Sequence, residues 1–222
     1  MSECTKLKEI NASAFYYTRA LKEAVNLTLS AGSLTTIGNS AFYYSGITSI
    51  DFTGCTKLDT INSSTFSNCL SLASVTLTGT SLKTIDDNAF YGCTALTTIN
   101  LEPVKSTLKN IKTSAFYNCN RLATVNLSSC TALETIGDSA FYRTTDFIED
   151  LEFKSTSALK TIGSSTFAYS GVKKLTVDGA PIELIKNNAF DHSKLVTADI
   201  KSNTKLLDIG ASAFAYCRSL TG

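Results

Sequence analysis

The chain has 222 residues and a formal net charge of +1, with 18% charged and 43% hydrophobic residues. This composition predicts a folded, soluble protein, and its near-neutral charge, without a block of Lys or Arg, lacks the electrostatic signature of a nucleic-acid-binding protein. No apolar run reaches the length of a membrane span, so we expect no membrane insertion.

A nine-residue motif, L-x-x-I-x-x-x-A/T-F, recurs nine times without gaining or losing a residue. It begins with Leu (once with Ile), places Ile three residues later, and ends on Phe15, Phe42, Phe66, Phe90, Phe116, Phe141, Phe167, Phe190 and Phe214. Successive Phe residues are 27, 24, 24, 26, 25, 26, 23 and 24 positions apart. A period of this length is typical of a solenoid, in which each coil packs against its neighbours.

Within one repeat, such as residues 82–101, the predicted elements follow in a fixed order. L-K-T-I at 82–85 predicts an extended stretch, and N-A-F-Y-G-C at 88–93 predicts a helical turn or a short 3₁₀ segment. L-T-T-I-N-L at 96–101 ends in an alternating segment that predicts a strand of three or four residues. A link of four to six residues follows, and the links hold both prolines, Pro103 and Pro181.

All changes of length fall outside the motif, as expected when connections absorb insertions and packed segments do not. We therefore expect a single array over residues 1–222, with no linker. Neither end shows a capping repeat, although solenoids need one to cover the core. The sequence predicts either a piece of a longer repeat protein or ends that stack on another molecule by self-association.

The full pattern, L-x-x-I-x-x-x-A-F-x-x-C-x-x-L-x-x-I-x-L, resembles the leucine-rich repeats of the BspA-like type. These occur in surface and secreted proteins of bacteria and of some parasitic protists. The resemblance implies a leucine-rich repeat solenoid, a right-handed α/β or mostly-β horseshoe, with short parallel strands on its concave face. It also implies adhesion or protein binding and a secreted or cell-surface location, although residues 1–10 carry no secretory signal. The proline that often follows the strand in that family is nearly absent here.

The seven cysteines occupy two repeat positions. Cys69, Cys93, Cys119 and Cys217 lie three residues after Phe, and Cys4, Cys55 and Cys130 lie eleven before it. Other repeats carry Ser, Thr, Ala or Gly at these positions, which predicts small, buried, free thiols. Disulfides are the alternative, because coils about 4.8 Å apart would bring Cys69, Cys93 and Cys119 into bonding range. No C-x-x-C pair is present, so we expect no metal and no cofactor.

His192 is the only histidine, and no nucleophile or second acid is singled out beside it. A general base needs such partners, so we interpret His192 as an ordinary surface residue. The common nucleotide, zinc-protease and nucleophile-elbow motifs are absent from the sequence. We expect no enzyme.

All nine tyrosines fall in the two positions after the motif Phe. Stacked coils would align them along one flank, whose first position holds Tyr16, Tyr43, Tyr91, Tyr117 and Tyr142. Two interpretations stay open: a ladder of rings that stabilises the coils, or an exposed aromatic strip that binds a partner.

The predicted strands offer a second candidate surface, made of residues that flank the inward-facing ones. It consists of Ser49, Asp51, Ser74, Thr76, Thr98, Asn100, Thr124, Asn126, Asp150, Glu152, Lys174, Thr176, Thr197 and Asp199. Most of these side chains are small and polar, and charges of both signs gather in the later coils. Plain solvation would suit them equally well, but solenoids bind partners through such extended faces.

These observations predict a non-enzymatic module that binds a protein, such as a host matrix or cell-surface protein, through its strand face. The alternative is a passive spacer or a self-associating surface-layer segment with no specific ligand.

Overall fold

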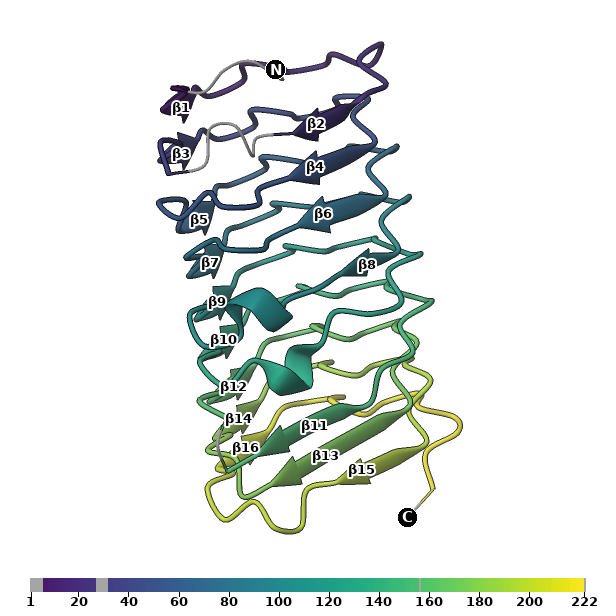
Figure 1. Cartoon of the computed structure of the whole chain (residues 1–222). Coiled ribbons are helices and arrows are strands. Elements are labelled where there is room, and N and C mark those ends of the chain that lie inside the picture. The colour runs from purple at the N-terminus through teal and green to yellow at the C-terminus, as the bar shows by residue number, and fades with distance from the viewer. Residues whose placement is uncertain (1–5, 27–31, 156, 222) are drawn as a thin grey trace.

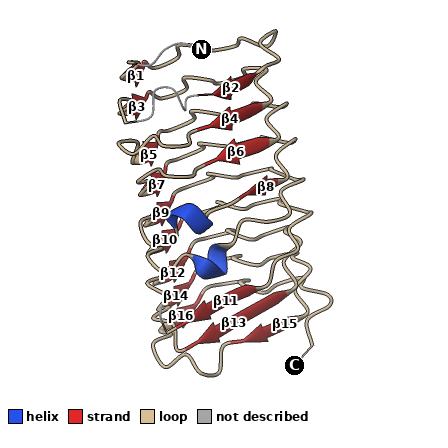
Figure 2. Ribbon diagram, in the orientation of Figure 1, coloured by secondary structure: helices blue, strands red, loops and turns tan. Residues whose placement is uncertain are grey.

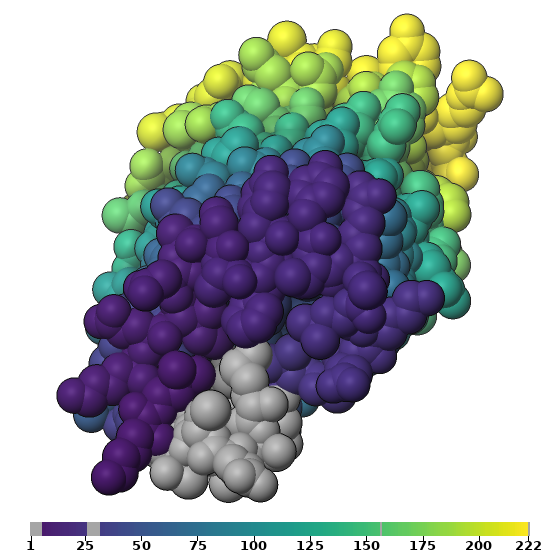
Figure 3. All heavy atoms as spheres, turned by 90° about the horizontal axis from the view of Figure 1, so that it is seen from above, coloured from purple at the N-terminus to yellow at the C-terminus, as the bar shows by residue number. Residues whose placement is uncertain are grey.

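The computed structural model describes residues 6–26, 32–155 and 157–221; Cys4 lies outside these ranges. The chain winds as a stack of similar coils in chain order (Figure 1). Viewed along the stack, the later coils emerge one behind another after the first (Figure 3). The predicted solenoid is confirmed, and it is of the mostly-β kind.

The described residues form short strands and two 3₁₀ helices. These are β1 (Glu9–Ile10), β2 (Ala24–Asn26), β3 (Thr36–Ile37), β4 (Ser49–Asp51), β5 (Thr60–Ile61), β6 (Ser74–Thr76), β7 (Thr84–Ile85), β8 (Thr98–Ile99), η2 (Glu102–Val104), β9 (Asn110–Ile111), η3 (Leu127–Ser129), β10 (Thr135–Ile136), β11 (Leu151–Lys154), β12 (Thr161–Ile162), β13 (Lys174–Asp178), β14 (Leu184–Ile185), β15 (Thr197–Asp199) and β16 (Asp208–Ile209).

The L-x-x-I stretches form one side of the stack, the L-x-x-I wall. Seven two-residue strands pair in parallel in the order β5-β7-β9-β10-β12-β14-β16, and β1 pairs with β3. The register follows the repeat, so Ile85 pairs with Ile111 and Ile111 with Ile136. Because alternate residues of a strand face opposite sides, each of these Ile residues is buried and the residue before it faces outward. The predicted second extended stretches of successive coils thus pair to form the largest sheet of the described residues.

The predicted strands form a second side, the strand wall, which is divided into two sheets. One has the order β2-β4-β6-β8 and the other β11-β13-β15, all parallel. Between the two sheets, Figure 2 shows η2 and η3, and the pairing is reduced to one bridge between Thr98 and Thr124. Pro103 lies in η2 and has no N–H to donate to a ladder, which favours the interruption there.

The A-F segments form the third side, the A-F wall, and the predicted helical turn is wrong here. In residues 88–93 the N–H groups of Asn88, Phe90 and Gly92 donate to carbonyls of the next coil over 2.8–2.9 Å. The N–H groups of Ala89, Tyr91 and Cys93 instead close turns within the coil. Left-handed φ angles at Asn88 (56°) and Gly92 (67°) produce this alternation, so the segment is a ladder of turns rather than a helix.

The left-handed angle explains why a Ser or Asn always stands two residues before the motif Phe. In all nine coils this residue has φ between 54° and 57°. Short polar side chains visit this region more readily than other L-residues, and Asn does so most often. The polar residue that opens each A-F segment is therefore needed by the turn.

A column of phenylalanine rings occupies the centre of the stack, as predicted from the period. The nine motif Phe rings stack face to face with centroids 4.9–5.4 Å apart and planes within 14° of parallel. The seven rings from Phe42 to Phe190 are fully buried, while Phe15 and Phe214 at the two ends are partly buried. Parallel columns of Leu and Ile line the ring column, so the hydrophobic core is shared between coils and no single coil forms one alone.

Candidate binding surfaces

The strand wall brings most of the predicted face residues into rows. Parallel register places Ser49 beside Ser74 and Asp51 beside Thr76 in the first sheet. In the second sheet it places Lys174 beside Thr197 and Thr176 beside Asp199. All fourteen predicted residues are exposed or half-buried, as an outward face requires.

The interruption of the wall removes four of these residues from the strands. Asn100 follows β8, Thr124 makes only the isolated bridge, and Asp150 precedes β11. Asn126 takes a left-handed φ of 60° before η3, and its N–H donates to the Glu149 carboxylate. The predicted face is therefore two patches rather than one continuous strip.

The two patches differ in charge. The first carries mainly hydroxyl groups, whereas the second holds an ion pair between Lys174 Nζ and Glu152 Oε1 over 2.9 Å. This contact lowers the pKa of Glu152 and raises the pKa of Lys174. Both groups remain open to solvent, so the pair fixes the direction of two charges without adding much stability.

A shallow hollow of about 390 Å³ lies on the second patch, over β13 and β15. Its lining consists of Lys174, Thr176, Thr197, Ala198, Asp199 and Lys201. The Thr176 hydroxyl is buried and has no protein partner for a hydrogen bond. This patch thus combines charges of both signs with an unpaired hydroxyl.

The predicted aromatic flank is a set of stacked rings. Tyr16 stacks on Tyr43 at 4.9 Å between centroids, and Tyr91, Tyr117 and Tyr142 stack in sequence at 4.8 Å. Tyr16 is 48% exposed and the other four are half-buried. Partial burial raises the pKa of Tyr43 and of Tyr117. The ring contacts agree with the ladder interpretation, although they leave the exposed edges available to a partner.

The ladder changes repeat position after Tyr142. Its ring meets Tyr169 edge-on at 5.5 Å, and the stack then continues through His192 at 4.6 Å to Tyr216 at 4.4 Å. His192 Nδ1 also lies 2.9 Å from Asp191 Oδ1. His192 is therefore one of the stacked rings of the ladder. The sequence indicated only an ordinary surface residue and did not predict this stacking.

Sequence reasoning missed a third surface, the corner between the A-F wall and the strand wall. The inward-facing strand residue follows the motif Phe by eight residues in the coils of Phe42, Phe167 and Phe190, but by nine or ten in the coils of Phe15, Phe66, Phe90, Phe116 and Phe141. Two of the three short corners contain Gly46 and Gly171, and the third has Lys194 at the equivalent position. A Cβ on Gly46 would lie 2.3 Å from the Arg19 carbonyl oxygen, and one on Gly171 would lie 2.4 Å from that of Phe147. Only glycine fits so closely, so the corner backbone packs directly against the preceding coil at both places.

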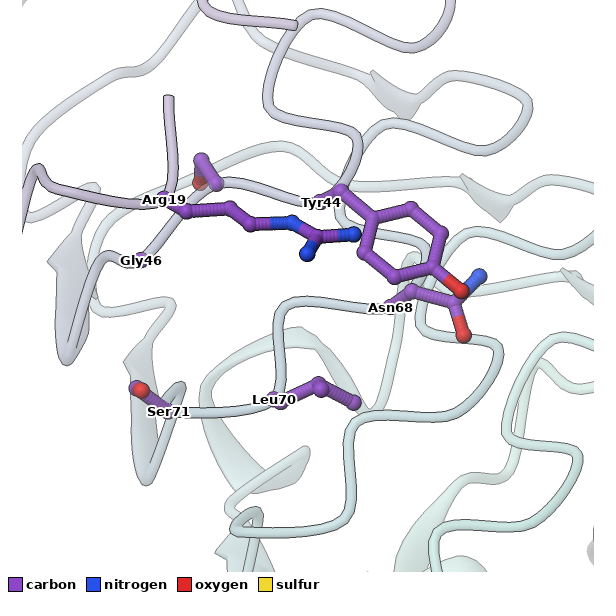
Figure 4. A pocket seen from close by; sticks show the side chains of 7 residues that line it. Arg19, Tyr44, Gly46, Asn68, Leu70 and Ser71 are labelled. Carbon is purple, nitrogen blue, oxygen red and sulfur yellow. The ribbon is translucent and has the colours of Figure 1, made fainter. Parts of the chain in front are cut away.

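A hollow lies beside each of these two glycines. The Arg19 hollow, of about 190 Å³, is lined by Arg19, Tyr44, Ser45, Gly46, Asn68, Leu70 and Ser71. Figure 4 shows Arg19 extended toward the Tyr44 ring, with Leu70 and Ser71 across the gap. The His192 hollow, of about 430 Å³, is lined by Asn118, Asn120, Arg143, Thr145, Tyr169, Ser170, His192 and Lys194. In the sequence, the variable spacing between the motif Phe and the next strand is the signal that could have indicated the Arg19 and His192 hollows.

The six cysteines that the structure describes are buried. Cys69, Cys93, Cys119, Cys130 and Cys217 are free thiols, and Cys55 is also buried. The Cys69 and Cys119 thiols donate to the carbonyls of Phe42 and Phe90 in the preceding coils, over 2.9 and 3.0 Å. Burial raises the pKa of Cys69 to about 11 and of Cys119 to about 12. These thiols stay protonated at neutral pH and are poor nucleophiles.

Within residues 6–26, 32–155 and 157–221, no group of His, Cys, Asp and Glu side chains could hold a metal ion. None of the helices in those ranges is both long enough and apolar enough to cross a membrane.

Parallel coils around a column of one Phe per repeat define a leucine-rich repeat solenoid, a scaffold that is often used for protein interaction and is typically non-catalytic. The chain belongs to the family described as the BspA type leucine rich repeat region (6 copies), whose profile matches residues 4–105 and 83–221.

Two solved structures are similar to the chain. A leucine-rich repeat protein from Bacteroides ovatus is 23% identical with a TM-score of 0.62, and the match covers 97% of this chain and 58% of that one. A leucine rich cell surface protein from Faecalibacterium prausnitzii is 22% identical with a TM-score of 0.46, covering 98% of this chain and 76% of that one. No curated protein matches the chain. The first likeness supports the fold, and this chain spans little more than half of that relative.

Proposed function

We propose that the chain is a non-catalytic protein-binding module that contacts a protein partner through the second patch of its strand wall. One observation carries this proposal: β11, β13 and β15 hold charges of both signs in fixed register around a hollow of about 390 Å³. Arranged charges select a partner and its orientation, whereas a surface kept only for solubility needs no such order.

The proposed partner is an extracellular protein, such as a host matrix or cell-surface protein. This follows the resemblance to surface-protein repeats. The buried thiols fit such a location, because thiols that remain protonated resist the oxidation that exposed thiolates undergo outside the cell. Fractionation of the source cells, with detection of the chain in the surface or medium fraction, tests the location.

The binding test uses the whole chain against a panel of immobilised extracellular-matrix proteins. Lys174→Glu combined with Lys201→Glu reverses the two cations beside the hollow. The matched control combines Lys57→Glu with Lys160→Glu, which makes the same change in net charge at exposed residues outside the patch. We expect the first pair to weaken binding at least about tenfold and the control pair to change it less than about twofold.

Equal loss in both pairs would mean that net charge, and not the patch, drives association. Absence of binding by the unaltered chain to every protein on the panel would contradict the proposal and favour the passive spacer.

A further inference from the structure

The His192 hollow is a built concavity away from the patch assigned above. It draws on four successive coils, and its volume of about 430 Å³ lies in the range of small-molecule sites. Seven of its eight lining residues occupy the second or fourth position after a motif Phe, so the repeat itself aims them at one corner. Beside the hollow, the backbone of Gly171 packs closely against the carbonyl oxygens of Thr145 and Phe147.

Two cations are fixed at the hollow. Lys194 reaches across the shortened coil, and its Nζ donates to the Thr145 carbonyl oxygen over 3.3 Å, two coils away. The Arg143 guanidinium lies over the rings of Tyr142 and Tyr169, 5.7 and 5.9 Å from their centroids. Packing against rings restricts an arginine while leaving its N–H groups free to donate. Both cations are therefore oriented before any ligand arrives.

Neither of these cations is neutralised by the protein. Among the ion pairs of the described residues, none includes Arg143 or Lys194. The nearby Asp191 Oδ1 lies 2.9 Å from His192 Nδ1, a contact that is an ion pair only when the imidazole is protonated. The hollow therefore favours an anion, and the planar guanidinium can pair with a carboxylate through two parallel hydrogen bonds.

The remaining polar groups call for more than an anion. The Ser170 hydroxyl, on a residue only 1% exposed, and the Asn120 side-chain oxygen are both without a hydrogen-bond partner in the protein. The Asn118 amide also lines the hollow. A bare carboxylate can accept hydrogen bonds but donates none at neutral pH, so it leaves the Asn120 oxygen unpaired. A ligand that carries both a carboxylate and hydroxyl groups satisfies both sets.

We propose that the His192 hollow binds an acidic sugar, a uronic acid unit of an oligosaccharide. Its carboxylate pairs with Arg143 and Lys194, and its hydroxyl groups bond to the side chains of Asn118, Asn120 and Ser170. This activity is separate from protein binding by the strand wall, so either can fail without the other.

The test titrates the whole chain with trigalacturonate by isothermal titration calorimetry at low salt. Two further probes separate the chemistry: the same trisaccharide with its carboxyls reduced to alcohols, and triglutamate as an acidic peptide. We expect the uronate to bind, and each of the other two probes to bind at least about tenfold more weakly, because each lacks one of the required groups.

Arg143→Gln and Lys194→Gln should each weaken trigalacturonate binding about tenfold, since each removes a charge-assisted hydrogen bond. Arg121→Gln and Lys173→Gln are the matched controls, because both residues are exposed and outside the hollow. The controls should change binding less than about twofold. Thermal unfolding checks that all four variants stay folded.

Three results would overturn the proposal: no heat or chemical-shift change with trigalacturonate, equal affinity for the reduced trisaccharide, or control variants that lose as much affinity as the test variants. Tighter binding of triglutamate would assign the hollow to an acidic peptide instead and would equally refute a sugar site.

Discussion

The Cys93 thiol donates a hydrogen bond to the carbonyl oxygen of Phe66 in the preceding coil over 3.1 Å, in the fully buried core. The same contact recurs from Cys217 to Phe190 over 3.1 Å. The position thus takes a small side chain, which Ser and Thr supply in other coils.

The buried thiols should make the protein less stable in alkaline solution. Burial holds the pKa of Cys69 at about 11 and that of Cys119 at about 12, whereas the same thiols ionise near pH 8.5 when the chain unfolds. Above about pH 8.5 the unfolded chain therefore binds fewer protons than the folded chain. The free energy of unfolding falls from there toward the folded pKa values, by up to about 1.4 kcal/mol per pH unit for each thiol.

Urea unfolding between about pH 7.5 and 10.5 measures this slope. The triple variant Cys69→Ser, Cys93→Ser, Cys119→Ser should lose stability less steeply than the original chain. Identical slopes would contradict the assignment. Alkylation under denaturing, non-reducing conditions is the control, and a count below the seven cysteines of the sequence would restore the disulfide alternative.

The phenylalanine column should be most sensitive at its centre. Phe90 is fully buried between two stacked rings, whereas Phe214 has one ring neighbour and is partly exposed. We expect Phe90→Ala to cost about 3–5 kcal/mol of unfolding free energy and Phe214→Ala clearly less. Because each coil is stabilised by its neighbours, Phe90→Ala should also split the urea transition into two steps. Equal losses with single transitions would argue against a continuous column.

The corner glycines should be irreplaceable by alanine. The methyl group of Gly46→Ala or Gly171→Ala would overlap a carbonyl oxygen of the preceding coil. Backbone must then move, and we expect a loss of at least about 1–3 kcal/mol in chemical denaturation. Thr94→Ala, at the same repeat position with a Cβ already in place, is the matched control and should cost less than about 1 kcal/mol. A tolerated Gly171→Ala would show that the close backbone packing at this corner does not require glycine.

The aromatic flank should behave as a ladder. Tyr91 and Tyr117 stack at 4.8 Å between centroids with planes 3° apart. A double-mutant cycle with Tyr91→Ala and Tyr117→Ala should give a coupling energy of about 0.5–1.5 kcal/mol. Tyr43 stacks in a separate group, so the cycle of Tyr43→Ala with Tyr117→Ala should give a value near zero. No coupling in the first cycle would support the exposed strip instead.

The sequence alone was enough to predict the stack, its period and the central ring column. The fixed spacing of Ile and Phe made this possible, because the same buried position in each of nine coils requires the same type of side chain. The helical turn was predicted wrongly because the pattern of Ser or Asn before A-F suits an N-cap and a left-handed turn equally well. Only the hydrogen bonds of Asn88, Phe90 and Gly92 to the next coil separate the two.

The candidate surfaces were harder to predict, since they depend on how neighbouring coils differ. Alternation placed Lys174 and Asp199 on the outward face, but the break at η2 and η3 lies in links of variable length. The two hollows arise where a coil shortened at Gly46 or Gly171 meets a longer one. A repeat averaged over all coils hides such differences, and the spacing of single coils reveals them.

The even spacing of the phenylalanine rings makes the coils interchangeable parts. Removing residues 91–116 would join Phe90 directly to Tyr117, and the shortened chain would present the same ring face above and below the cut. Whole periods could be excised or duplicated in this way without redesigning any interface. The length of the solenoid is then set by the number of repeats, independently of which side chains each coil exposes.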